Sequence, residues 1–296
     1  MKLLIRLLLA IVVLIAAAAA TIYALSEQRL NKHYDVAVER IPIPTDTAAI
    51  ERGGHVAKIR GCRECHGDDL GGATVVEDPK AGMIYGVNLT RGRGGLPEDF
   101  SDADFVRAIR HGVARNGRPL LLMPSAEFHA LTEQDVGDVI AYVKNVPPVD
   151  RQVPPSRFGP IMRAVLVLDR NAELLSAEHI DHAAKAATTA PATEMDQGRY
   201  LAVSCTFCHG DGFSGGTIPG VPPDFPPAKN LTTGGEMKSW SEEDFAKLLR
   251  TGLTPDGRKL DPKYMPWTAF KAATDPEIHA LWTYLRSVPA KPDGQR

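Results

Sequence analysis

The sequence has almost no excess of charge of either sign, because 34 lysine and arginine residues face 36 aspartate and glutamate residues. A formal net charge of -2 gives no reason to expect nucleic acid or an acidic polymer as a partner. The composition of a disordered chain is also missing, since 44% of the residues are hydrophobic and 24% are charged. The 296 residues are therefore expected to fold, and they suffice for two ordinary domains.

Cysteine is scarce, and all four cysteines fall in two copies of one pattern. Residues 62–66 read Cys-Arg-Glu-Cys-His and residues 205–209 read Cys-Thr-Phe-Cys-His. The pattern C-x-x-C-H is typical of covalent haem attachment, in which the cysteines bond the porphyrin and the histidine ligates the iron. We therefore predict two covalently attached haem c groups. The predicted attachment residues are Cys62, Cys65, Cys205 and Cys208, and the predicted iron ligands are His66 and His209.

Zinc binding and disulfide chemistry are the competing uses of such cysteine pairs. Zinc sites made from two C-x-x-C units usually keep them about 15–20 residues apart, whereas these motifs begin at residues 62 and 205. A redox-active C-x-x-C belongs in a thioredoxin-like βαβ setting, and the sequence around the motifs does not have that pattern. Haem attachment remains the leading interpretation.

An apolar run begins near the N-terminus of the sequence. If Leu7–Leu25 is helical, it reaches roughly 28 Å, close to the ~30 Å hydrocarbon core of a bilayer. Lys2 and Arg6 precede the run, so the positive-inside rule directs the residues beyond it to the periplasm. We predict that residues 1–26 are a single-pass anchor in the cytoplasmic membrane. A signal peptide cleaved near Ala18–Ala20 and a buried core helix are the alternatives.

The two halves of the sequence repeat the same series of short motifs. Each half has an Asn-Leu-Thr triplet, a Ser-capped helix with Arg-x-Gly, a Met-Pro pair and a last helix ending in Val-Pro. The series occupies residues 46–149 and recurs in residues 194–290, which indicates duplication of a whole domain. Residues 150–193 are predicted to be a linker, in which the apolar stretch Ile161–Leu168 forms a short helix.

Each half is expected to be helical. A helix leads into each cysteine motif, and a Gly/Pro-rich stretch after it is expected to be a loop. Two further helices in each half start at a Ser or Thr with an acidic residue three positions later, which is capping-box chemistry. These predicted caps are Ser101, Thr132, Ser241 and Thr274. The predicted fold class is all-α.

The second axial ligand of each iron decides between electron transfer and catalysis. Met123 and Met265 lie at matching points of the repeat, and each precedes a proline that biases the methionine towards extended backbone. A loop of this kind can project a thioether towards the iron, and His/Met ligation raises the reduction potential. We predict that both methionines are ligands. His111 and His129 are rival ligands for the first haem only, because neither has a histidine counterpart in the second half.

Other residues are candidates for the haem surroundings. Asn88 and Asn230 open the Asn-Leu-Thr triplets and are predicted to contact the haem edge or propionates, with a turn cap as the alternative. The three tryptophans are expected to be walls of the haem pocket, namely Trp240, Trp267 and Trp282. The methionines that do not recur are expected to be core residues, namely Met83, Met162, Met195 and Met237.

The series C-x-x-C-H-G, N-L-T, a Ser-capped helix with R-x-G, M-P and a closing helix ending in V-P resembles the class I cytochrome c domain. The resemblance covers residues 46–149 and 194–290, and it implies two tandem domains of this type. The arrangement behind an N-terminal anchor is similar to the membrane-bound cytochrome c subunits of bacterial alcohol, aldehyde and gluconate dehydrogenases. Those subunits typically carry three haem domains, whereas this sequence has motifs for two.

This resemblance implies an electron carrier in the periplasm. The expected donor is a dehydrogenase or a respiratory complex, the expected acceptor is a protein such as a terminal oxidase, and no nucleic acid is involved. A dihaem redox enzyme of the thiosulfate dehydrogenase or peroxidase type, in which one haem opens for substrate, is the alternative. A haem sensor is a third interpretation. Dihaem redox enzymes usually have a cysteine ligand or an open iron position, whereas here each half offers a methionine, which favours the electron carrier.

Overall fold

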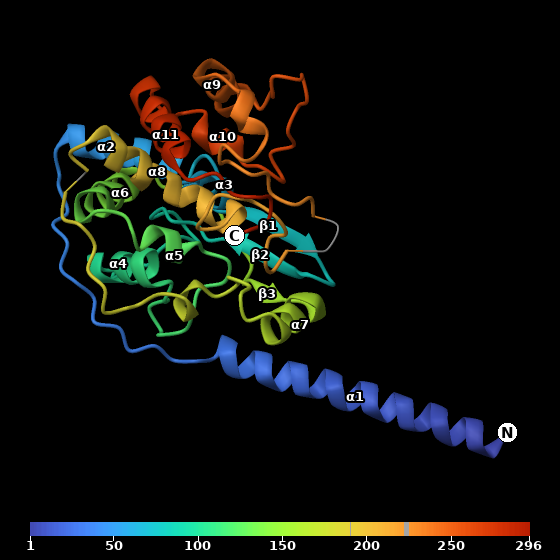
Figure 1. The fold of residues 1–296 in the computed structure, drawn as a ribbon. Coiled ribbons are helices and arrows are strands. Elements are labelled where there is room, and N and C mark those ends of the chain that lie inside the picture. Colours follow the sequence, from blue (N-terminus) through green and yellow to red (C-terminus); the bar gives the residue numbers. More distant parts are fainter. Residues whose placement is uncertain (190, 222–224) are drawn as a thin grey trace.

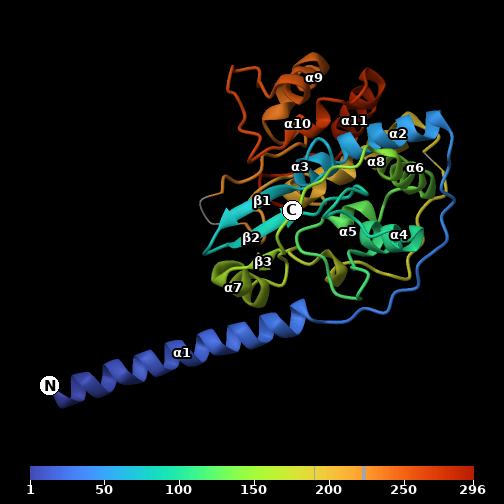
Figure 2. The ribbon, with the colours of Figure 1, turned by 180° about the vertical axis from the view of Figure 1, so that it is seen from behind.

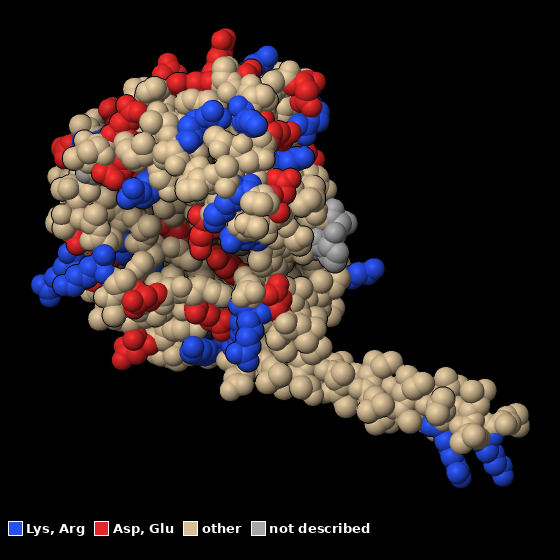
Figure 3. Space-filling view, in the orientation of Figure 1, with Lys and Arg blue, Asp and Glu red and all other residues tan. Residues whose placement is uncertain are grey.

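The computed structural model describes residues 1–189, 191–221 and 225–296, and it places one long helix outside a folded body (Figure 1). This helix is α1 (Lys2–Leu30), and Figure 2 shows it pointing away from the body when seen from behind. Among the described residues, α1 is the one helix long and apolar enough to cross a membrane, and its apolar stretch is not buried. The apolar helix is therefore confirmed, and the exposure speaks against a buried core helix. Figure 3 shows basic side chains at its far tip and a long uncharged stretch behind them.

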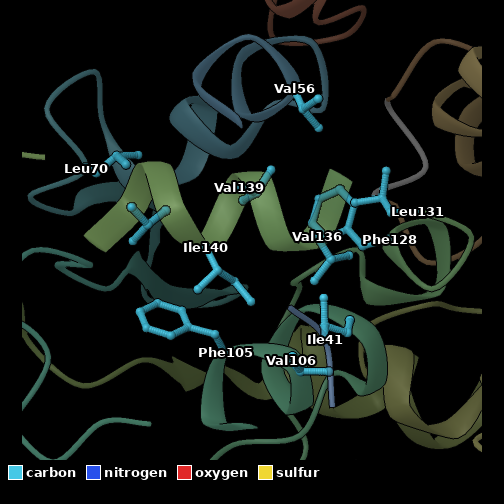
Figure 4. Close-up of a cluster of buried hydrophobic side chains, with 11 residues drawn as sticks. Ile41, Val56, Leu70, Phe105, Val106, Phe128, Leu131, Val136, Val139 and Ile140 are labelled. Carbon is cyan, nitrogen blue, oxygen red and sulfur yellow. The ribbon is translucent and has the colours of Figure 1, made fainter. Parts of the chain in front are cut away.

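The first half of the body packs its helices around one hydrophobic core. The helices are α2 (Thr47–Ile59), α3 (Cys62–His66), α4 (Asp102–His111), α5 (Ser125–Phe128) and α6 (Glu133–Asn145). Helices α2 and α4 both contact α6. Figure 4 shows Val136, Val139 and Ile140 of α6 between Val56 of α2 and Phe105 of α4. Val136, Val139, Ile140 and Val143 follow the i, i+3, i+4, i+7 spacing of one helical face, and this face of α6 is buried.

The second half repeats this order of helices. They are α8 (Glu194–His209), α9 (Glu242–Thr251), α10 (Trp267–Phe270) and α11 (Asp275–Ser287), with a short 3-10 turn, η2 (Glu236–Ser239), before α9. Helix α8 packs against α11 as α2 packs against α6. Leu201, Phe245 and Leu281 belong to a second buried cluster that joins α8, α9 and α11.

A glycine permits the helix crossing in each half. A Cβ atom on Gly53 of α2 would lie 1.9 Å from the carbonyl oxygen of Asp138 in α6. A Cβ atom on Gly198 of α8 would lie 2.0 Å from the carbonyl oxygen of Ala280 in α11. Both distances are far below van der Waals contact, so only glycine lets the two backbones approach this closely. The crossings are therefore the same in geometry as well as in sequence order.

The four predicted helix starts are confirmed. Each Ser or Thr accepts a hydrogen bond from the backbone N–H three residues later, and the caps are Ser101, Thr132, Ser241 and Thr274. The reciprocal bond from the acidic side chain, which completes a capping box, forms at every start except Thr132.

The all-α expectation is incomplete, because the stretch after the first motif forms a β-hairpin where we predicted a loop. Strand β1 (Ala73–Asp78) pairs antiparallel with β2 (Gly82–Gly86), and β3 (Arg157–Phe158) adds a third strand. Asp78 organises the turn, since its Oδ1 accepts hydrogen bonds from the N–H groups of Lys80 (2.7 Å) and Ala81 (3.2 Å). The two hairpin strands have only six and five residues and are flanked by glycines, so their sequence pattern resembled a loop.

The predicted linker folds onto the first half. It carries β3, helix α7 (Pro160–Leu168) at the expected apolar stretch, and the turn η1 (Ser176–Glu178). Leu166 of α7 is fully buried in a third cluster with Ile84 of β2 and Phe158 of β3. The segment therefore forms part of the body.

Candidate haem-attachment sites

The two motif histidines are oriented in the same way. Nδ1 of His66 lies 2.8 Å from the carbonyl oxygen of Val87, and Nδ1 of His209 lies 2.6 Å from that of Lys229. A carbonyl can only accept, so Nδ1–H donates in both rings and Nε2 is left free to ligate iron. Burial lowers the pKa of both histidines, which favours the neutral imidazole that a metal requires.

The backbone beyond each motif also repeats. Gly67 and Gly210 end the motif helices with φ of +80° and +75°. Four residues after each histidine, Leu70 and Phe213 take left-handed conformations with φ of 54° and 57°. Non-glycine residues rarely adopt this conformation. Its recurrence at matching positions supports a common architecture for the two attachment turns.

One cavity in the second half gathers the predicted haem residues. It has a volume of about 310 Å³, and its lining includes Cys205, Cys208, His209 and Met265. The surrounding wall is mainly apolar and comes from α9, α11 and the segment before α9, with Trp240 among its residues. The tertiary structure thus brings Met265 to the same cavity as the cysteine motif 56 positions earlier, as the ligand prediction requires.

The other two tryptophans lie elsewhere. Trp267 donates its indole N–H to the carbonyl of Leu260 at 3.1 Å and packs over Gly252. Trp282 stacks on Phe245, with ring centroids 5.5 Å apart. Neither contributes to the lining of the described cavity, so Trp240 alone matches the expected wall position.

The residues present fit a covalently bound haem. The cavity offers two thiols, an oriented neutral imidazole, a thioether and an apolar wall. Burial raises the pKa of the thiols of Cys62 and Cys205 to about 12. Among the described residues, no group of three or more His, Cys, Asp or Glu side chains is arranged to hold a metal ion. The zinc alternative gains no support.

The two Met-Pro loops have the same backbone form. Ser125 N–H donates to the carbonyl of Met123 at 2.8 Å, and Trp267 N–H donates to the carbonyl of Met265 at 2.7 Å. The prolines after these methionines have φ and ψ of -79° and 53° in the first half, and -77° and 56° in the second. Met123 packs against the first core cluster.

The rival histidine ligands are engaged in other contacts. Nδ1 of His111 lies 3.0 Å from Nδ1 of His182, and its Nε2 lies 3.4 Å from a carboxylate oxygen of Glu39. His129 donates from Nδ1 to the carbonyl of Arg110 at 2.9 Å, and its buried Nε2 has no protein partner among the described residues. Both nitrogens of His111 therefore have protein partners, which weakens the case for His111 in a bis-histidine first haem.

The two predicted asparagines organise turns. Asn88 is buried, its Nδ2 donates to the carbonyl of Val149 at 2.7 Å, and its Oδ1 accepts from the backbone N–H of Thr90 at 2.9 Å. Asn230 makes the equivalent bonds to Lys291 at 2.8 Å and to Thr232 at 2.9 Å. Each amide thus clamps the end of its half to the turn after the motif. These are the bonds of the turn-capping alternative.

A contact between the halves, which sequence reasoning missed, joins the two motifs. Arg60 lies two residues before Cys62, is 9% exposed and crosses to helix α8. Its Nη1 donates to Ser204 Oγ at 2.8 Å, and its Nη2 donates to the carbonyl of Tyr200 at 3.1 Å. Ser204 directly precedes Cys205, so one side chain connects the approaches to both attachment sites.

Two further contacts are related by the internal repeat. His55 of α2 lies 2.8 Å from a carboxylate oxygen of Glu277, the capping acid of α11. Tyr200 of α8 donates its hydroxyl to Asp135, the acid at the same place in α6, and accepts the backbone N–H of Thr132 at 3.2 Å. Tyr200 therefore takes the place of the missing capping-box bond at Thr132. In each half, a polar aromatic side chain therefore contacts the N-terminus of the last helix of the other half.

The Met-Pro helices complete this reciprocal interface. Helix α5 contacts α8, and helix α10 contacts α2. Thr268 of α10 donates to Glu64 within the first motif at 3.2 Å. Glu127 of α5 lies close enough to Cys205 for their charges to interact, and burial raises the pKa of Glu127 to about 8. The Met-Pro loop of each half thus packs beside the motif helix of the other.

Comparison with known proteins supports the predicted similarity. Residues 195–289 match the model of the cytochrome c family. The fructose dehydrogenase cytochrome subunit of Gluconobacter japonicus is 28% identical over 86% of this chain and 55% of its own length. The cytochrome c subunit of the quinone alcohol dehydrogenase of Gluconacetobacter polyoxogenes is 28% identical, over 84% of this chain and 58% of its own length.

The gluconate 2-dehydrogenase cytochrome c subunit of Pantoea cypripedii is also 28% identical, over 84% of this chain and 61% of its own length. The chain therefore spans a little over half the length of these relatives. Its similarity to cytochrome c subunits of bacterial dehydrogenases is confirmed. A cytochrome c domain around Cys205, Cys208 and His209 implies covalent haem c and a role in electron transport.

Proposed function

We propose that this chain is a membrane-tethered dihaem cytochrome c that carries electrons in the periplasm through two His/Met-ligated haems. The observation that carries the proposal is the cavity in the second half, where Met265 joins Cys205, Cys208 and His209. The first half has the same histidine orientation at His66 and the same Met-Pro backbone at Met123. The two repeats are proposed to be tandem class I-like domains.

The protein's part in electron transfer is to hold the ligands and exclude water. When bound, haem supplies one-electron exchange between ferric and ferrous iron. The Val87 and Lys229 carbonyls hold the imidazoles of His66 and His209 with Nε2 free for the iron. With haem bound, the apolar wall of the cavity would disfavour the additional charge of ferric iron and, together with Met265 as the thioether ligand, would raise the reduction potential.

The interface between the halves favours one dihaem unit over two independent carriers. Arg60, which precedes Cys62, hydrogen-bonds to α8 just before Cys205. His55 contacts Glu277 and Tyr200 contacts Thr132, so further contacts join the two halves. A fixed separation keeps the transfer between the haems from depending on domain motion. Donor and acceptor can then meet different halves of the same body.

The proposed donor is a periplasmic dehydrogenase, because relatives are named as cytochrome subunits of fructose, alcohol and gluconate dehydrogenases. The proposed acceptor is a membrane protein such as a terminal oxidase. Helix α1 supports retention at the cytoplasmic membrane, since an uncleaved anchor would hold the haem body near membrane-bound partners.

Carbon monoxide binding to the fully reduced protein tests the ligand proposal. We expect a pyridine haemochrome assay to give two haems per chain and the visible spectrum to stay unchanged under carbon monoxide. The Met265→Ala variant should bind carbon monoxide at one haem and show a lower potential for that haem alone. Met123→Ala is the matched variant and should open the other haem. Binding at one haem of the wild type would instead favour the redox-enzyme alternative.

A further inference from the structure

Helix α7 is attached to the end of α1 by a basic side chain. Arg163 of α7 donates to Ser26 Oγ at 2.9 Å and to a carboxylate oxygen of Glu27 at 2.7 Å. Its guanidinium also lies 4.5 Å from the ring centroid of Tyr23. Tyr23 lies about one helical turn before Ser26 and Glu27, so the three partners share one face of α1. Helix α7 therefore lies beside residues 23–27 of α1.

A second side chain connects the two elements in the opposite direction. Arg29 of α1 donates from Nε to Glu178 at 3.0 Å, and it also donates to the carbonyl of Leu166 within α7. Arg29 and Glu178 are both largely buried, with 25% and 15% of their side chains exposed. Two clamps at different points hold α1 in a defined orientation against the body, which is the orientation seen in Figures 1 and 2.

The position of α7 along α1 sets its depth relative to a bilayer. The apolar run of α1 ends at Leu25, and Tyr23 lies within its last turn. Tyrosine is enriched at the membrane–water interface, where its ring is apolar and its hydroxyl is hydrated. If α1 spans the membrane, as the proposed function holds, the Tyr23–Glu27 level is the headgroup region. Helix α7 then lies at that level as well.

One face of α7 exposes large apolar side chains. Leu166 is fully buried in the third core cluster, and Met162 and Val165 pack against the same cluster. Ile161 and Leu168 are 48% and 74% exposed. They are seven residues apart and therefore lie on the same face of the helix. Beyond residues 1–30, the described structure has only two other exposed large hydrophobic residues, Val75 and Val87.

Lys80 and Arg170 lie at the two ends of this apolar face, with Asp78 and Asp169 near them in the chain. Lys80 is exposed at the tip of the β-hairpin, and its carbonyl accepts the N–H of Ile161 at 2.9 Å, which fixes it at the start of α7. Arg170 is exposed two residues after Leu168. An apolar face with cations beside it is the chemistry of a helix that binds at an anionic lipid surface.

We propose that α7 is a second membrane contact, namely an interfacial helix. Its face with Ile161 and Leu168 lies among the headgroups of the leaflet from which the C-terminal end of α1 emerges. The occupant of this face is an anionic phospholipid surface. The inference rests on the proposed anchor, and it adds that α1 and α7 together orient the haem body relative to the bilayer. A body held in this way presents a constant side to membrane-bound redox partners.

Spin-label accessibility in the full-length holoprotein tests the contact. The variants Ile161→Cys and Leu168→Cys each provide one thiol for a nitroxide, because the native cysteines are proposed to be thioethers. The protein is placed in vesicles of phosphatidylglycerol and phosphatidylethanolamine. The nitroxide is then exposed to oxygen, which concentrates in lipid, and to a polar nickel chelate, which stays in water. Unsubstituted protein gives the background labelling.

Two control positions make the outcomes distinguishable. Val13→Cys reports whether α1 is within the bilayer, and Glu243→Cys labels an exposed position on α9, at the opposite end of the body from α1 (Figure 1). We expect the labels at 161 and 168 to be severalfold more accessible to oxygen than to the chelate. This preference should be weaker than that of the label at 13. The label at 243 should show the reverse preference, for the chelate. The preference should weaken when phosphatidylglycerol is replaced by a zwitterionic lipid.

Three results would overturn the proposal. If labels at 161 and 168 favour the nickel chelate while the label at 13 favours oxygen, α7 lies off the membrane and the anchor stands. If both are protected from both reagents, a second copy or a partner protein covers the face instead of lipid. If the label at 13 itself favours the chelate, the anchor fails, and the depth assigned to α7 fails with it.

Discussion

The two halves differ most where the chain enters the C-x-x-C-H motif. In the second half, α8 runs without a break into the motif, whereas in the first half Gly61, with φ of +72°, separates α2 from the short motif helix α3. When the crossing glycines Gly53 and Gly198 are matched, the first half has two extra residues before its motif, Arg60 and Gly61. Arg60 is the residue that crosses to the other half. A small asymmetry in a duplicated domain thus provides a central contact of the interface.

The halves also differ in the segments that cover them. The first half receives the segment after α1, where Tyr34 N–H donates to the carbonyl of Gly117 at 2.9 Å, together with the hairpin and the folded linker. The second half is covered by its C-terminal segment, in which Arg296 donates to the carbonyl of Cys208 at 2.7 Å. Both halves therefore have the same helical core. The segments that cover the core lie towards α1 in the first half and against the motif helix in the second half.

The largest effect is expected where the halves are most alike, at the helix crossing. Gly198→Ala should destabilise the protein by about 3 kcal/mol, because its Cβ would meet a backbone oxygen at 2.0 Å. Gly257→Ala is the control: it has φ of +83° and no atom within 4 Å of the added Cβ. The control should cost only about 1 kcal/mol, from the left-handed backbone. Denaturant unfolding measures both variants, and equal losses would contradict the close crossing.

Breaking the asymmetric contact should have the next largest effect. Arg60→Ala is expected to cost about 2 kcal/mol, since it removes buried charge-assisted hydrogen bonds to Ser204 and Tyr200. Arg199→Ala on α8 is the matched control, because Arg199 is 65% exposed and its loss should cost less than about 0.5 kcal/mol. Thermal unfolding at neutral pH measures the difference. A loss no larger than that of the control would mean that Arg60 does not hold the halves together.

Glu127 distinguishes the two Met-Pro helices, because Ala269 takes its place in the second half. Burial raises the pKa of Glu127 to about 8, so the folded protein holds a proton there that the unfolded chain releases above the ordinary value of 4.5. Stability should therefore fall as pH rises between these values, by about 2 kcal/mol from about pH 6 to about pH 8. Glu127→Gln should remove this slope, and Glu243→Gln should keep it. An unchanged slope in Glu127→Gln would show that the carboxyl is already ionised.

The smallest effect is expected at the two reciprocal contacts. Glu277 raises the pKa of His55, so this ion pair contributes fully below pH 6.5 and is lost as pH rises through the raised value. Tyr200, at the equivalent place, has a pKa raised to about 12 and stays neutral throughout that range. His55→Gln should abolish a pH-dependent contribution of about 1 kcal/mol or less, whereas Tyr200→Phe should leave the pH dependence intact. Unfolding measured from pH 5 to 9 separates the two cases.

Much of the fold was predictable because its signals are local. The caps at Ser101, Ser241 and Thr274 need only a hydroxyl and an acid three residues apart, and the structure has them. The hairpin was missed because its strands are short and its third strand comes from a distant segment. The incomplete capping box at Thr132 could not be predicted either, because the hydroxyl that replaces its missing bond belongs to Tyr200, which is far away in the sequence.

Covalent haem attachment could be predicted from the chain alone, since C-x-x-C-H is a local sequence requirement of attachment. The apolar N-terminal helix and the order of helices in each half were predictable for the same reason. Folding in three dimensions was needed to bring Met265 into one cavity with His209, to connect the halves through Arg60, and to place α7 level with Tyr23. These contacts join residues far apart in the chain, and they depend on how the buried faces pack, which local spacing does not specify.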